Sequence, residues 1–363
     1  MHYNEGMDIR IEPSKLRRVE LPQNPKMFGF GKHTTERLFV QKYSSEQGWH
    51  DAAIIALSSF PKLSPMASVF HYGQEIFEGH KAYRRPDGDI NLFRAKDNAK
   101  RLNRSAQRMA MPGIPVEDQL EAVQTLIDEE RAWVPAYEGT SLYLRPTMIA
   151  TDEALGVHPS ETYLYYIVLS LAGNYFPQGF KPIAVKVETE NRRAVVGGTG
   201  EAKTGGNYAA SLAAASRAQK EGFSQVLWLD AREGKWIEEV GAMNICFVYG
   251  DHIITPSLSG SILPGITRDS LLKLAPDLGF SMQEKKIDIA TVIADIKSGR
   301  ITEVFGCGTA AVIAPIDQLG YEGKIYQVRS NRPDSVAAKL KRELTAIQYG
   351  EVPDLYGWTK VIR

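Results

Sequence analysis

Cysteine is scarce in this sequence, and its scarcity excludes several kinds of site. Only two cysteines, Cys246 and Cys307, occur among 363 residues, and no CxxC pair is present. A zinc ribbon or a thioredoxin-type motif needs paired cysteines, so both are excluded. Cysteine scarcity also fits a reducing cytosol. We therefore expect a cytoplasmic protein without a metal centre.

The chain also lacks an excess charge of either sign and any long apolar run. Lys plus Arg and Asp plus Glu both number 43, so no general attraction for nucleic acid or anionic membranes is expected. No apolar stretch reaches the about 20 residues that span a bilayer. Residues 1–26 have neither a signal-peptide nor a transit-peptide pattern. The longest apolar run, 163–172, has the length of a buried strand. A local small-molecule site is the remaining expectation.

The length of the chain predicts two domains. Residues 173–182 contain two prolines and two glycines, which is typical of a connector. We place the first domain at 1–173, the connector at 174–182 and the second domain at 183–363.

Strand-like and helix-like segments alternate along the chain, which predicts a mixed α/β (α+β) fold. Apolar spacing and turn residues set the expected bounds of each segment. Strands are expected at 38–43, 90–93, 142–150, 162–171, 183–188, 224–230, 244–249 and 252–255, and helices at 94–109, 116–133, 207–221, 268–278, 289–298 and 335–349.

The richest glycine loop, 197–208, places five glycines around Lys203. Glycine permits positive φ and close approach of the backbone to a ligand, so the lysine is a candidate reactive or phosphate-facing group. A Schiff-base lysine needs such a loop, a nearby anion site and an acid for a pyridinium nitrogen. A solvated surface turn is the plain alternative. A P-loop is the other, but Ala202 stands where that motif needs its second glycine.

Two further loops favour a phosphate ligand. At 263–268, Pro264-Gly265 leads into a helix, and the N–H groups of Ile266 and Thr267 would form an anion site on its dipole. The GCGTA turn at 306–310 supplies a hydroxyl and further N–H groups. Each loop alone is only a helix start or a tight turn. The acid is expected at 238–239, where Glu239 precedes an apolar strand, although paired glutamates there can equally be a polar strand edge.

The ordered motifs of this sequence closely resemble those of branched-chain amino acid aminotransferases, which are fold type IV pyridoxal-phosphate enzymes. The likeness extends from about residue 20 to about residue 350. It is carried by FGFGK at 28–32, HY at 71–72, IFEGHKAY at 76–83, SLYLRP at 141–146, KTGGNY at 203–208, QVLWL at 225–229, EVGAMN at 239–244, ILPG at 262–265 and EVFGCGTA at 303–310.

The resemblance implies a two-domain fold, with a smaller N-terminal α/β domain and a larger C-terminal β-pseudobarrel domain with helices. It implies that Lys203 holds pyridoxal 5'-phosphate as a Schiff base and moves the substrate proton. The enzyme would transfer amino groups from Leu, Ile and Val to 2-oxoglutarate. The cofactor-binding residues implied are Arg101, Arg193, Tyr208, Glu239, Ile266, Thr267 and Thr309.

The resemblance also implies a substrate pocket and a homodimer. Tyr72 would reach the site of the partner subunit, and Arg145 would accept the distal carboxylate of glutamate. The remaining substrate residues implied are Phe30, Phe77, Tyr143, Val157, Tyr175, Ala242 and Ala310. An aromatic residue taken by itself is more often part of a core.

The chain departs from some relatives at two places. Some carry threonine at the position of Ala242, so one hydroxyl contact to the substrate carboxylate is lacking here. Animal relatives carry a CxxC pair where this chain has Ala311 and Ala314, so redox control by that pair is not transferable. D-amino acid aminotransferases and aminodeoxychorismate lyases use a lysine, an arginine and a glutamate in the same roles. They are the alternatives within the same fold.

Overall fold

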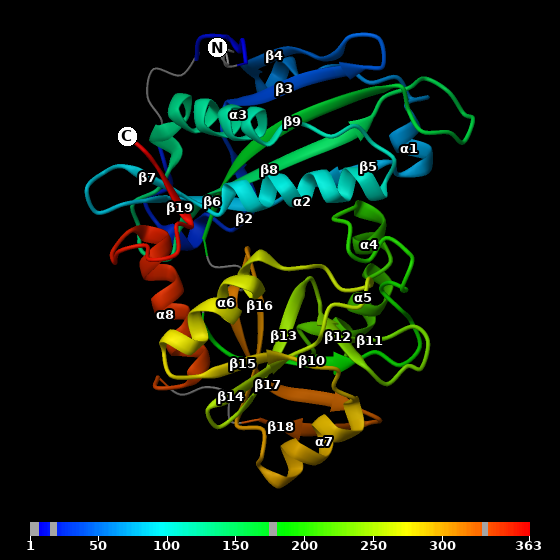
Figure 1. Cartoon of the computed structure of the whole chain (residues 1–363), viewed down its shortest axis with the longest axis vertical. Helices are drawn as coiled ribbons and strands as arrows, with labels where there is room; N and C mark the ends of the chain where they lie inside the picture. The colour runs from blue at the N-terminus through cyan, green and yellow to red at the C-terminus, as the bar shows by residue number, and fades with distance from the viewer. Residues whose placement is uncertain (1–6, 15–19, 174–179, 329–332) are drawn as a thin grey trace, which may run out of the picture. The chain divides into compact units, whose positions relative to one another are not determined.

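The computed structural model describes residues 7–14, 20–173, 180–328 and 333–363. Its backbone contacts divide the chain into two compact units. The first unit consists of Met1–Pro177 and Ile347–Arg363, and the second of Gln178–Ala346. Figure 1 shows the course of the chain through both units.

The first unit is built on a ten-stranded sheet with the order β1-β4-β3-β9-β8-β6-β7-β19, where β2 pairs with β9 and β5 with β8. All pairs in it are antiparallel except β1–β4. Its strands are β1 (Arg10–Ile11), β2 (Phe30–Thr34), β3 (Arg37–Ser44), β4 (Gly48–Ala56), β5 (Glu75–Phe77), β6 (His80–Arg84), β7 (Ile90–Phe93), β8 (Ser141–Ala150), β9 (Thr162–Ala172) and β19 (Thr359–Ile362).

Helices α1 (Ser68–Tyr72), α2 (Ala95–Arg108) and α3 (Val116–Glu129) belong to the same unit, together with short 3-10 turns at Pro25–Met27, Leu57–Ser59 and Arg131–Trp133. Helix α3 is shorter than the predicted 116–133, because its last turn becomes the separate 3-10 turn after Glu130. The predicted helix 94–109 and the strands at 38–43, 90–93, 142–150 and 162–171 are confirmed within about two residues.

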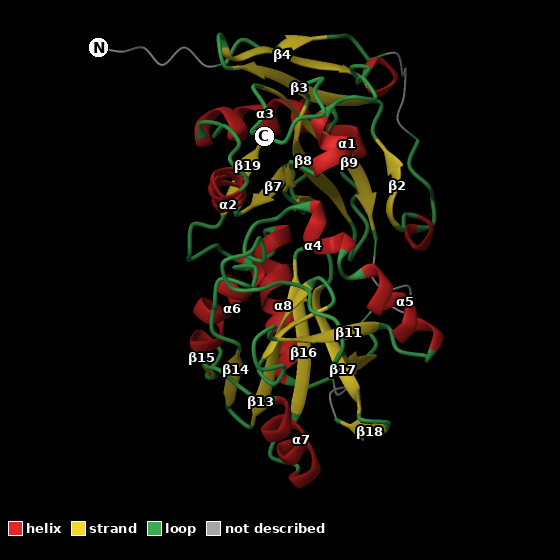
Figure 2. Ribbon diagram, turned by 90° about the vertical axis from the view of Figure 1, so that its right-hand side faces the viewer, coloured by secondary structure: helices red, strands yellow, loops and turns green. Residues whose placement is uncertain are grey.

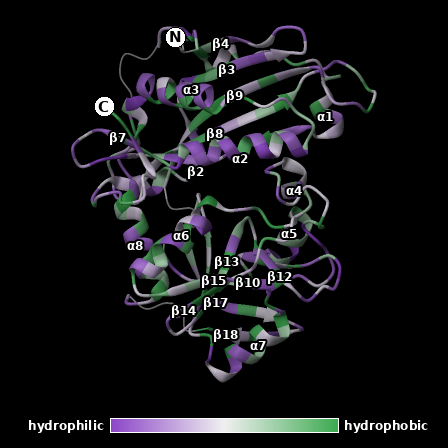
Figure 3. Ribbon diagram, in the orientation of Figure 1, coloured by the Kyte–Doolittle hydropathy of each residue, from purple (hydrophilic) through white to green (hydrophobic). Residues whose placement is uncertain are grey.

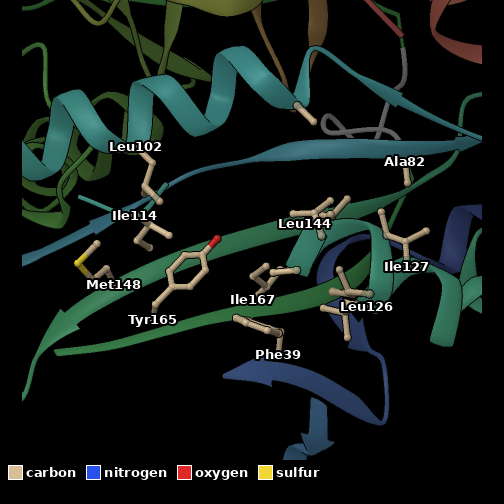
Figure 4. Close-up of a cluster of buried hydrophobic side chains, with 14 of the residues drawn as sticks. Phe39, Ala82, Leu102, Ile114, Leu126, Ile127, Leu144, Met148, Tyr165 and Ile167 are labelled. Carbon is tan, nitrogen blue, oxygen red and sulfur yellow. The ribbon is translucent and has the colours of Figure 1, made fainter. Parts of the chain in front are cut away.

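The main core of the first unit lies between the sheet and helices α2 and α3 (Figure 4). Side chains of a strand alternate between its two faces, so β9 turns Tyr163, Tyr165 and Ile167 into this core and Leu164 into a smaller cluster on the other face. Helix α2 is rich in hydrophilic residues (Figure 3), and it contributes few large apolar side chains, chiefly Leu102. The buried side of α2 is therefore partly polar.

The second unit contains a nine-stranded sheet that closes on itself. Its order is β12-β11-β10-β17-β16-β13-β14-β15, and β12 also pairs with β13, so the strands from β12 to β13 form a ring. This ring is the predicted barrel-like domain. Its strands are β10 (Ile183–Val187), β11 (Gln225–Leu229), β12 (Ile237–Val240), β13 (Met243–Tyr249), β14 (His252–Thr255), β15 (Ser281–Glu284), β16 (Glu303–Gly308), β17 (Val312–Tyr321) and β18 (Lys324–Gln327).

The helices of the second unit, drawn in red in Figure 2, are α4 (Gly205–Ala209), α5 (Leu212–Lys220), α6 (Ile266–Asp277), α7 (Ile289–Ser298) and most of α8 (Val336–Tyr349). From Ile347 on, the residues of α8 are assigned to the first unit. The prediction of a single helix over 207–221 is wrong. The chain turns at Ala210–Ser211, where the Ser211 hydroxyl donates to the Tyr208 carbonyl at 2.6 Å. Serine competes in this way for backbone carbonyls, whereas the alanine-rich composition had favoured one continuous helix.

The C-terminal residues belong to a different domain from the one predicted. We assigned residues 183–363 to the second domain, whereas Ile347–Arg363 belong to the first unit, which is thereby the longer of the two. The reason is a long-range pairing, since β19 joins β7 in antiparallel register from Thr359↔Phe93 to Ile362↔Ile90. Most of the predicted connector, residues 174–179, lies outside the described residues.

The described residues contain neither a membrane-spanning helix nor a cluster of metal-ligating side chains. None of the helices in these residues combines the length and apolar character needed to cross a membrane. The same residues contain no group of three or more His, Cys, Asp and Glu side chains arranged to hold a metal ion.

Candidate active site

Lys203 lies in a turn-rich segment directly before α4 and is half-buried. Its Nζ donates a hydrogen bond to the Tyr208 hydroxyl at 2.7 Å and lies 5.2 Å from the centre of that ring. The chain thus presents a partly accessible primary amine beside a phenol. An amine in this setting can react with a carbonyl, and a phenol at this distance can share its proton.

Asn207 fixes the loop that carries the lysine. Its Nδ2 donates to the carbonyls of Thr199 (2.7 Å) and Ala202 (2.8 Å), and its Oδ1 accepts from the Thr199 hydroxyl at 2.8 Å. These three bonds close residues 199–207 into a compact turn and hold Lys203 in place. The sequence analysis gave Asn207 no role, because a loop asparagine has no distinctive spacing.

Close packing requires glycine at position 200. A Cβ on Gly200 would lie 2.3 Å from the Ser261 carbonyl oxygen, which no real side chain tolerates. The lysine loop is therefore packed directly against the segment that leads to α6. The same Ser261 carbonyl accepts a hydrogen bond from Nη2 of Arg193, so Arg193 joins the lysine loop to that segment.

Glu239 in β12 is a buried carboxylate with two partners, a backbone N–H group and an arginine. Its Oε1 accepts the Leu263 N–H at 2.6 Å, and its Oε2 lies 3.3 Å from Arg193 Nε. Only 4% of Glu239 and 9% of Arg193 is exposed. A buried cation beside a buried carboxylate favours its charged form.

Asn244 lies opposite Glu239 in the β12–β13 pair and donates through Nδ2 to the Leu263 carbonyl at 3.0 Å. Glu239 and Asn244 thus hold the N–H and the C=O of the same residue. A Cβ on Gly265 would lie 1.9 Å from Asn244 Oδ1, so glycine is required where the chain enters α6. No side chain caps this helix, and Ile266 and Thr267 form its buried first turn.

The GCGTA turn lies at the same end of the sheet as the β12–β13 turn. Asn244 pairs with Cys307 in the next strand, and β16 ends one residue later at Gly308. A Cβ on Gly308 would lie 3.9 Å from the Ala242 carbonyl oxygen. Gly308, which directly precedes Thr309 and Ala310, therefore lies close to Ala242.

These groups fit pyridoxal 5'-phosphate chemically. Lys203 supplies an amine for an aldehyde, Glu239 supplies a charged oxygen for a pyridine nitrogen, and the positive end of the α6 dipole suits a phosphate. The hydroxyl of Thr204, next to the lysine, is buried without a hydrogen-bond partner in the described structure, so one further donor is available there. All these residues belong to the second unit.

The first unit groups four predicted substrate residues. Phe30 and Tyr143 meet edge to face with ring centres 4.7 Å apart. The Arg145 guanidinium lies 4.7 Å from the Phe77 ring centre, and its Nη2 donates to the Tyr143 hydroxyl at 3.2 Å. Arg145 Nε is buried with no hydrogen-bond partner among the described residues. An aromatic cluster with one cation that keeps an unpaired N–H suits a substrate that is apolar or carries a distal carboxylate.

Gly79 makes that cluster possible. A Cβ on Gly79 would lie 1.9 Å from the Tyr143 hydroxyl oxygen, so any other residue would displace the ring of Tyr143. This explains physically the glycine in the FEG string of the sequence.

Arg101 in α2 is buried and paired with Glu78. Its Nε lies 2.7 Å from Glu78 Oε1 and its Nη2 lies 2.9 Å from Oε2. Sequence reasoning named Arg101 but missed Glu78, because the two residues are 23 positions apart and no local spacing links them.

Three further predicted residues lie outside these clusters. Tyr72 is 42% exposed at the end of α1, and its hydroxyl donates to the Leu155 carbonyl. Val157 is 84% exposed. Tyr175 lies outside the described residues.

The two cysteines are buried neighbours on adjacent strands, since Cys246 pairs with Phe305 and Asn244 with Cys307. The sequence analysis left open whether they meet in space. A hydrogen bond with the Cys246 thiol, together with burial, raises the pKa of Cys307. A thiol with a raised pKa is a poor nucleophile.

Comparisons with known proteins agree on one family. The model of the Amino-transferase class IV family matches residues 75–319. The chain is 46% identical over 356 residues to a probable branched-chain-amino-acid aminotransferase of Streptomyces coelicolor, with 96% of this chain and 97% of that protein covered. It is 48% identical over 335 residues to the branched-chain-amino-acid aminotransferase of Mycolicibacterium smegmatis, with 91% of each covered.

A solved structure extends the agreement to the fold. The structure matches that of the branched-chain amino acid aminotransferase from Escherichia coli at a TM-score of 0.70 and 27% identity, with 89% of this chain and 98% of that one covered. The chain therefore belongs to the class IV aminotransferases and, within them, to the branched-chain-amino-acid aminotransferases. This membership removes the P-loop alternative.

Proposed function

We propose that this protein transfers the amino group of Leu, Ile or Val to 2-oxoglutarate, with pyridoxal 5'-phosphate attached to Lys203. The observation that carries the proposal is the Lys203–Tyr208 hydrogen bond of 2.7 Å in the same unit as the buried Glu239–Arg193 pair. One unit thus supplies both the amine and the acid that the chemistry of this cofactor needs.

The second unit holds the groups that bind the cofactor in this proposal. When bound, pyridoxal phosphate supplies an electron sink for the charge that develops at the substrate Cα. Glu239 keeps the ring nitrogen protonated, and Arg193 in turn holds Glu239 charged. The N–H groups of Ile266 and Thr267 and the hydroxyl of Thr309 would bind the phosphate. Arg101 is a further proposed phosphate ligand.

Lys203 moves the proton in the chemical step. With the cofactor bound, its Nζ would carry the proton between the substrate Cα and C4′ of the cofactor. The Tyr208 hydroxyl accepts a hydrogen bond from that nitrogen and so keeps the amine directed while it changes protonation state. The half-reaction of the amino donor and that of 2-oxoglutarate use the same amine, with proton transfer in opposite directions.

The substrate pocket must accept both an apolar side chain and the carboxylate of glutamate. Phe30, Phe77 and Tyr143 offer aromatic surface, which gains roughly 1–3 kcal/mol for each methylene-sized group of the substrate. Arg145 offers its unsatisfied Nε to the distal carboxylate. Ala242 and Ala310 lie beside the α-carboxylate, and Tyr175 remains a predicted pocket residue.

A panel of amino donors with 2-oxoglutarate tests the proposed activity. Leu, Ile and Val are expected to be good donors, while Ala should be poor for lack of apolar surface and Asp because its carboxylate would be buried. Equal kcat/KM for Ala and Leu would contradict the aromatic pocket.

We also propose that the enzyme is a cytoplasmic homodimer in which Tyr72 reaches the active site of the partner. Supporting this, exposed apolar side chains concentrate around α1 and residues 155–157, namely Met66 (42%), Phe70 (61%), Leu155 (56%) and Val157 (84%). Exposed apolar groups in such number mark an interaction surface. Sedimentation at assay concentration is the test, and a fully active monomer would refute it.

A further inference from the structure

Glu78 and Arg101 form a two-point ion pair in the interior of the first unit. Nε and Nη2 of Arg101 lie 2.7 and 2.9 Å from the two carboxylate oxygens, and the Gly79 N–H donates to Oε2 at 3.1 Å. Only 1% of Glu78 and 3% of Arg101 is exposed. A buried pair of this kind gains little net stability, because both charges lose their water. Its main effect is geometric, because two parallel hydrogen bonds hold the planar guanidinium of Arg101 in one orientation.

A small cavity lies next to this pair. Its volume of ≈ 10 Å³ is room for about one water molecule. Its polar lining consists of Glu78, His80, Asn98, Gln119 and Tyr165. Each of these side chains is less than a tenth exposed, so the polar lining belongs to the interior of the unit.

Three polar atoms of that lining have no hydrogen-bond partner in the described structure. They are His80 Nδ1, Asn98 Oδ1 and the Tyr165 hydroxyl oxygen. Figure 4 shows the Tyr165 hydroxyl pointing from β9 toward α2, the helix that carries Asn98 and Arg101. Unpaired polar atoms are strongly unfavourable inside a protein. The three residues that carry these atoms all line the one cavity, so a polar molecule there is the candidate partner for them.

The protonation states of the lining suit a water molecule. Burial lowers the pKa of His80 to about 4, so its ring is neutral at physiological pH. Burial, followed by the charge of Glu78, raises the pKa of Tyr165, so its hydroxyl keeps its proton. A water molecule can donate to Asn98 Oδ1 and accept from the tyrosine, and buried waters typically make about three such bonds.

We propose that one buried water fills this cavity and, with His80, Asn98 and Tyr165, supports Glu78, which positions Arg101 for the phosphate of the cofactor. The inference rests on the phosphate role proposed above for Arg101. Glu78 is a positioning residue, because it acts on the phosphate only through the guanidinium. Without the carboxylate, Arg101 keeps its charge and loses its fixed orientation.

The chain offers a matched control for this role. Arg37 and Glu130 also form a buried ion pair in the first unit, with Nε 2.6 Å from Oε1 and side chains 5% and 4% exposed. Arg37 additionally donates to the carbonyls of Glu12 and Glu129, which ties the end of α3 to the sheet. Arg37 Nη1 also lies 2.9 Å from Glu129 Oε2. Glu130→Gln therefore removes one buried carboxylate partner of an arginine in the same unit without touching Arg101.

The decisive measurement compares pyridoxal phosphate with pyridoxal, which lacks the phosphate. The apo-protein is titrated with each compound, and the ratio of the two Kd values reports the phosphate preference alone. Glu78→Gln should reduce this preference by about tenfold or more, because a misoriented arginine loses a charged hydrogen bond, while Glu130→Gln leaves it unchanged. An unchanged or increased preference in Glu78→Gln overturns the positioning role. If that variant fails to fold, Glu78→Asp, which withdraws the carboxylate by one methylene, is expected to give a smaller loss in the same direction.

Arg101→Gln separates failure of this inference from failure of the role on which it rests. If Arg101→Gln leaves the phosphate preference intact, Arg101 is not a phosphate ligand and both proposals fall. If Arg101→Gln abolishes the preference and the two Glu78 variants keep it, only the positioning role falls.

Tyr165→Phe tests the water. If the hydroxyl binds a buried water, its removal leaves that water short of a partner, and the Tm of the variant should fall. If the cavity is dry, removal of an unpaired hydroxyl should leave the Tm unchanged or raise it, which would overturn this part of the proposal. A high-resolution crystal structure of the holoenzyme must also show one water within hydrogen-bond distance of His80 Nδ1, Asn98 Oδ1 and the Tyr165 hydroxyl, and an empty cavity would refute it.

Discussion

Replacement of Glu239 by glutamine should separate two contributions of this carboxylate. One is to stability, through its ion pair with Arg193, and the other is to catalysis, through the ring nitrogen of the cofactor. Arg193 Nε lies 3.3 Å from Glu239 Oε2, where two unit charges attract by about 5 kcal/mol at an effective dielectric constant near 20. The amide removes this attraction, and breaking a buried pair costs about 3–5 kcal/mol of stability. The amide oxygen can still accept the Leu263 N–H, which now lies at 2.6 Å. We therefore expect a folded but destabilised variant.

The effect of Glu239→Gln on catalysis should exceed its effect on cofactor loading. The protein groups that bind the phosphate still anchor pyridoxal phosphate, while the ring nitrogen loses the negative charge that keeps it protonated. The kcat should fall by about 100-fold or more, a size typical for loss of a preorganised electrostatic partner. Visible absorbance measures loading, steady-state kinetics measures kcat, and urea unfolding of the apo-protein measures stability. A variant with the kcat of the wild type would refute the pyridinium role.

Glu238→Gln is the control, since Glu238 is the adjacent strand residue and is also 4% exposed. Burial raises the pKa of Glu238, although a hydrogen bond from Ser261 opposes this. Because its folded pKa lies above the unfolded one, the wild type loses stability as pH rises through the folded pKa. The neutral amide does not, so the stability difference should move in favour of Glu238→Gln with rising pH. If this control loses as much kcat as Glu239→Gln, the effect is not specific to the ring nitrogen.

Three further predictions follow from the site. Lys203→Ala should abolish transamination and the absorbance of the lysine-bound cofactor, and a cofactor bond that borohydride still reduces would show another attachment point. Arg145→Gln should raise the KM for glutamate by about tenfold or more and change the KM for leucine little, since the charged hydrogen bond serves only the distal carboxylate; an equal rise for both substrates would argue against that role. Mild peroxide should not switch activity off reversibly, because Cys246 and Cys307 are buried and the pKa of Cys307 is raised. The assay adds dithiothreitol after peroxide, and a loss that dithiothreitol restores in the wild type but that does not occur in Cys307→Ser would contradict this.

Local patterns predicted most regular elements of this chain. The strand at 90–93 and the helix at 289–298 have the predicted bounds, because each has a clear apolar period and ends at a turn or cap residue. The helix at 207–221 was wrong, since its break depends on one serine hydroxyl bonded to a backbone carbonyl. Composition cannot indicate such a bond.

The sequence by itself determined which residue types are available to the site and where the backbone must be glycine. Lys203, Glu239 and the three glycine-rich loops could be named from chemistry and spacing, and ordered motifs indicated the family. Steric reasons that the structure supplies for Gly79, Gly200 and Gly265 agree with this, since each would place a Cβ within 2.3 Å of a neighbouring atom.

Only the tertiary structure decided which distant residues act on one another. The return of residues 347–363 to the first unit depends on pairing of β19 with β7, and the closure of the barrel depends on β12 pairing with two strands. The Glu78–Arg101 and Arg193–Glu239 pairs join residues 23 and 46 positions apart. Spacing along the chain carries a signal only over a few residues, where one helix turn or one strand period sets the geometry. Partners farther apart are chosen by burial, because a charge removed from water must find whatever opposite charge the fold brings to it.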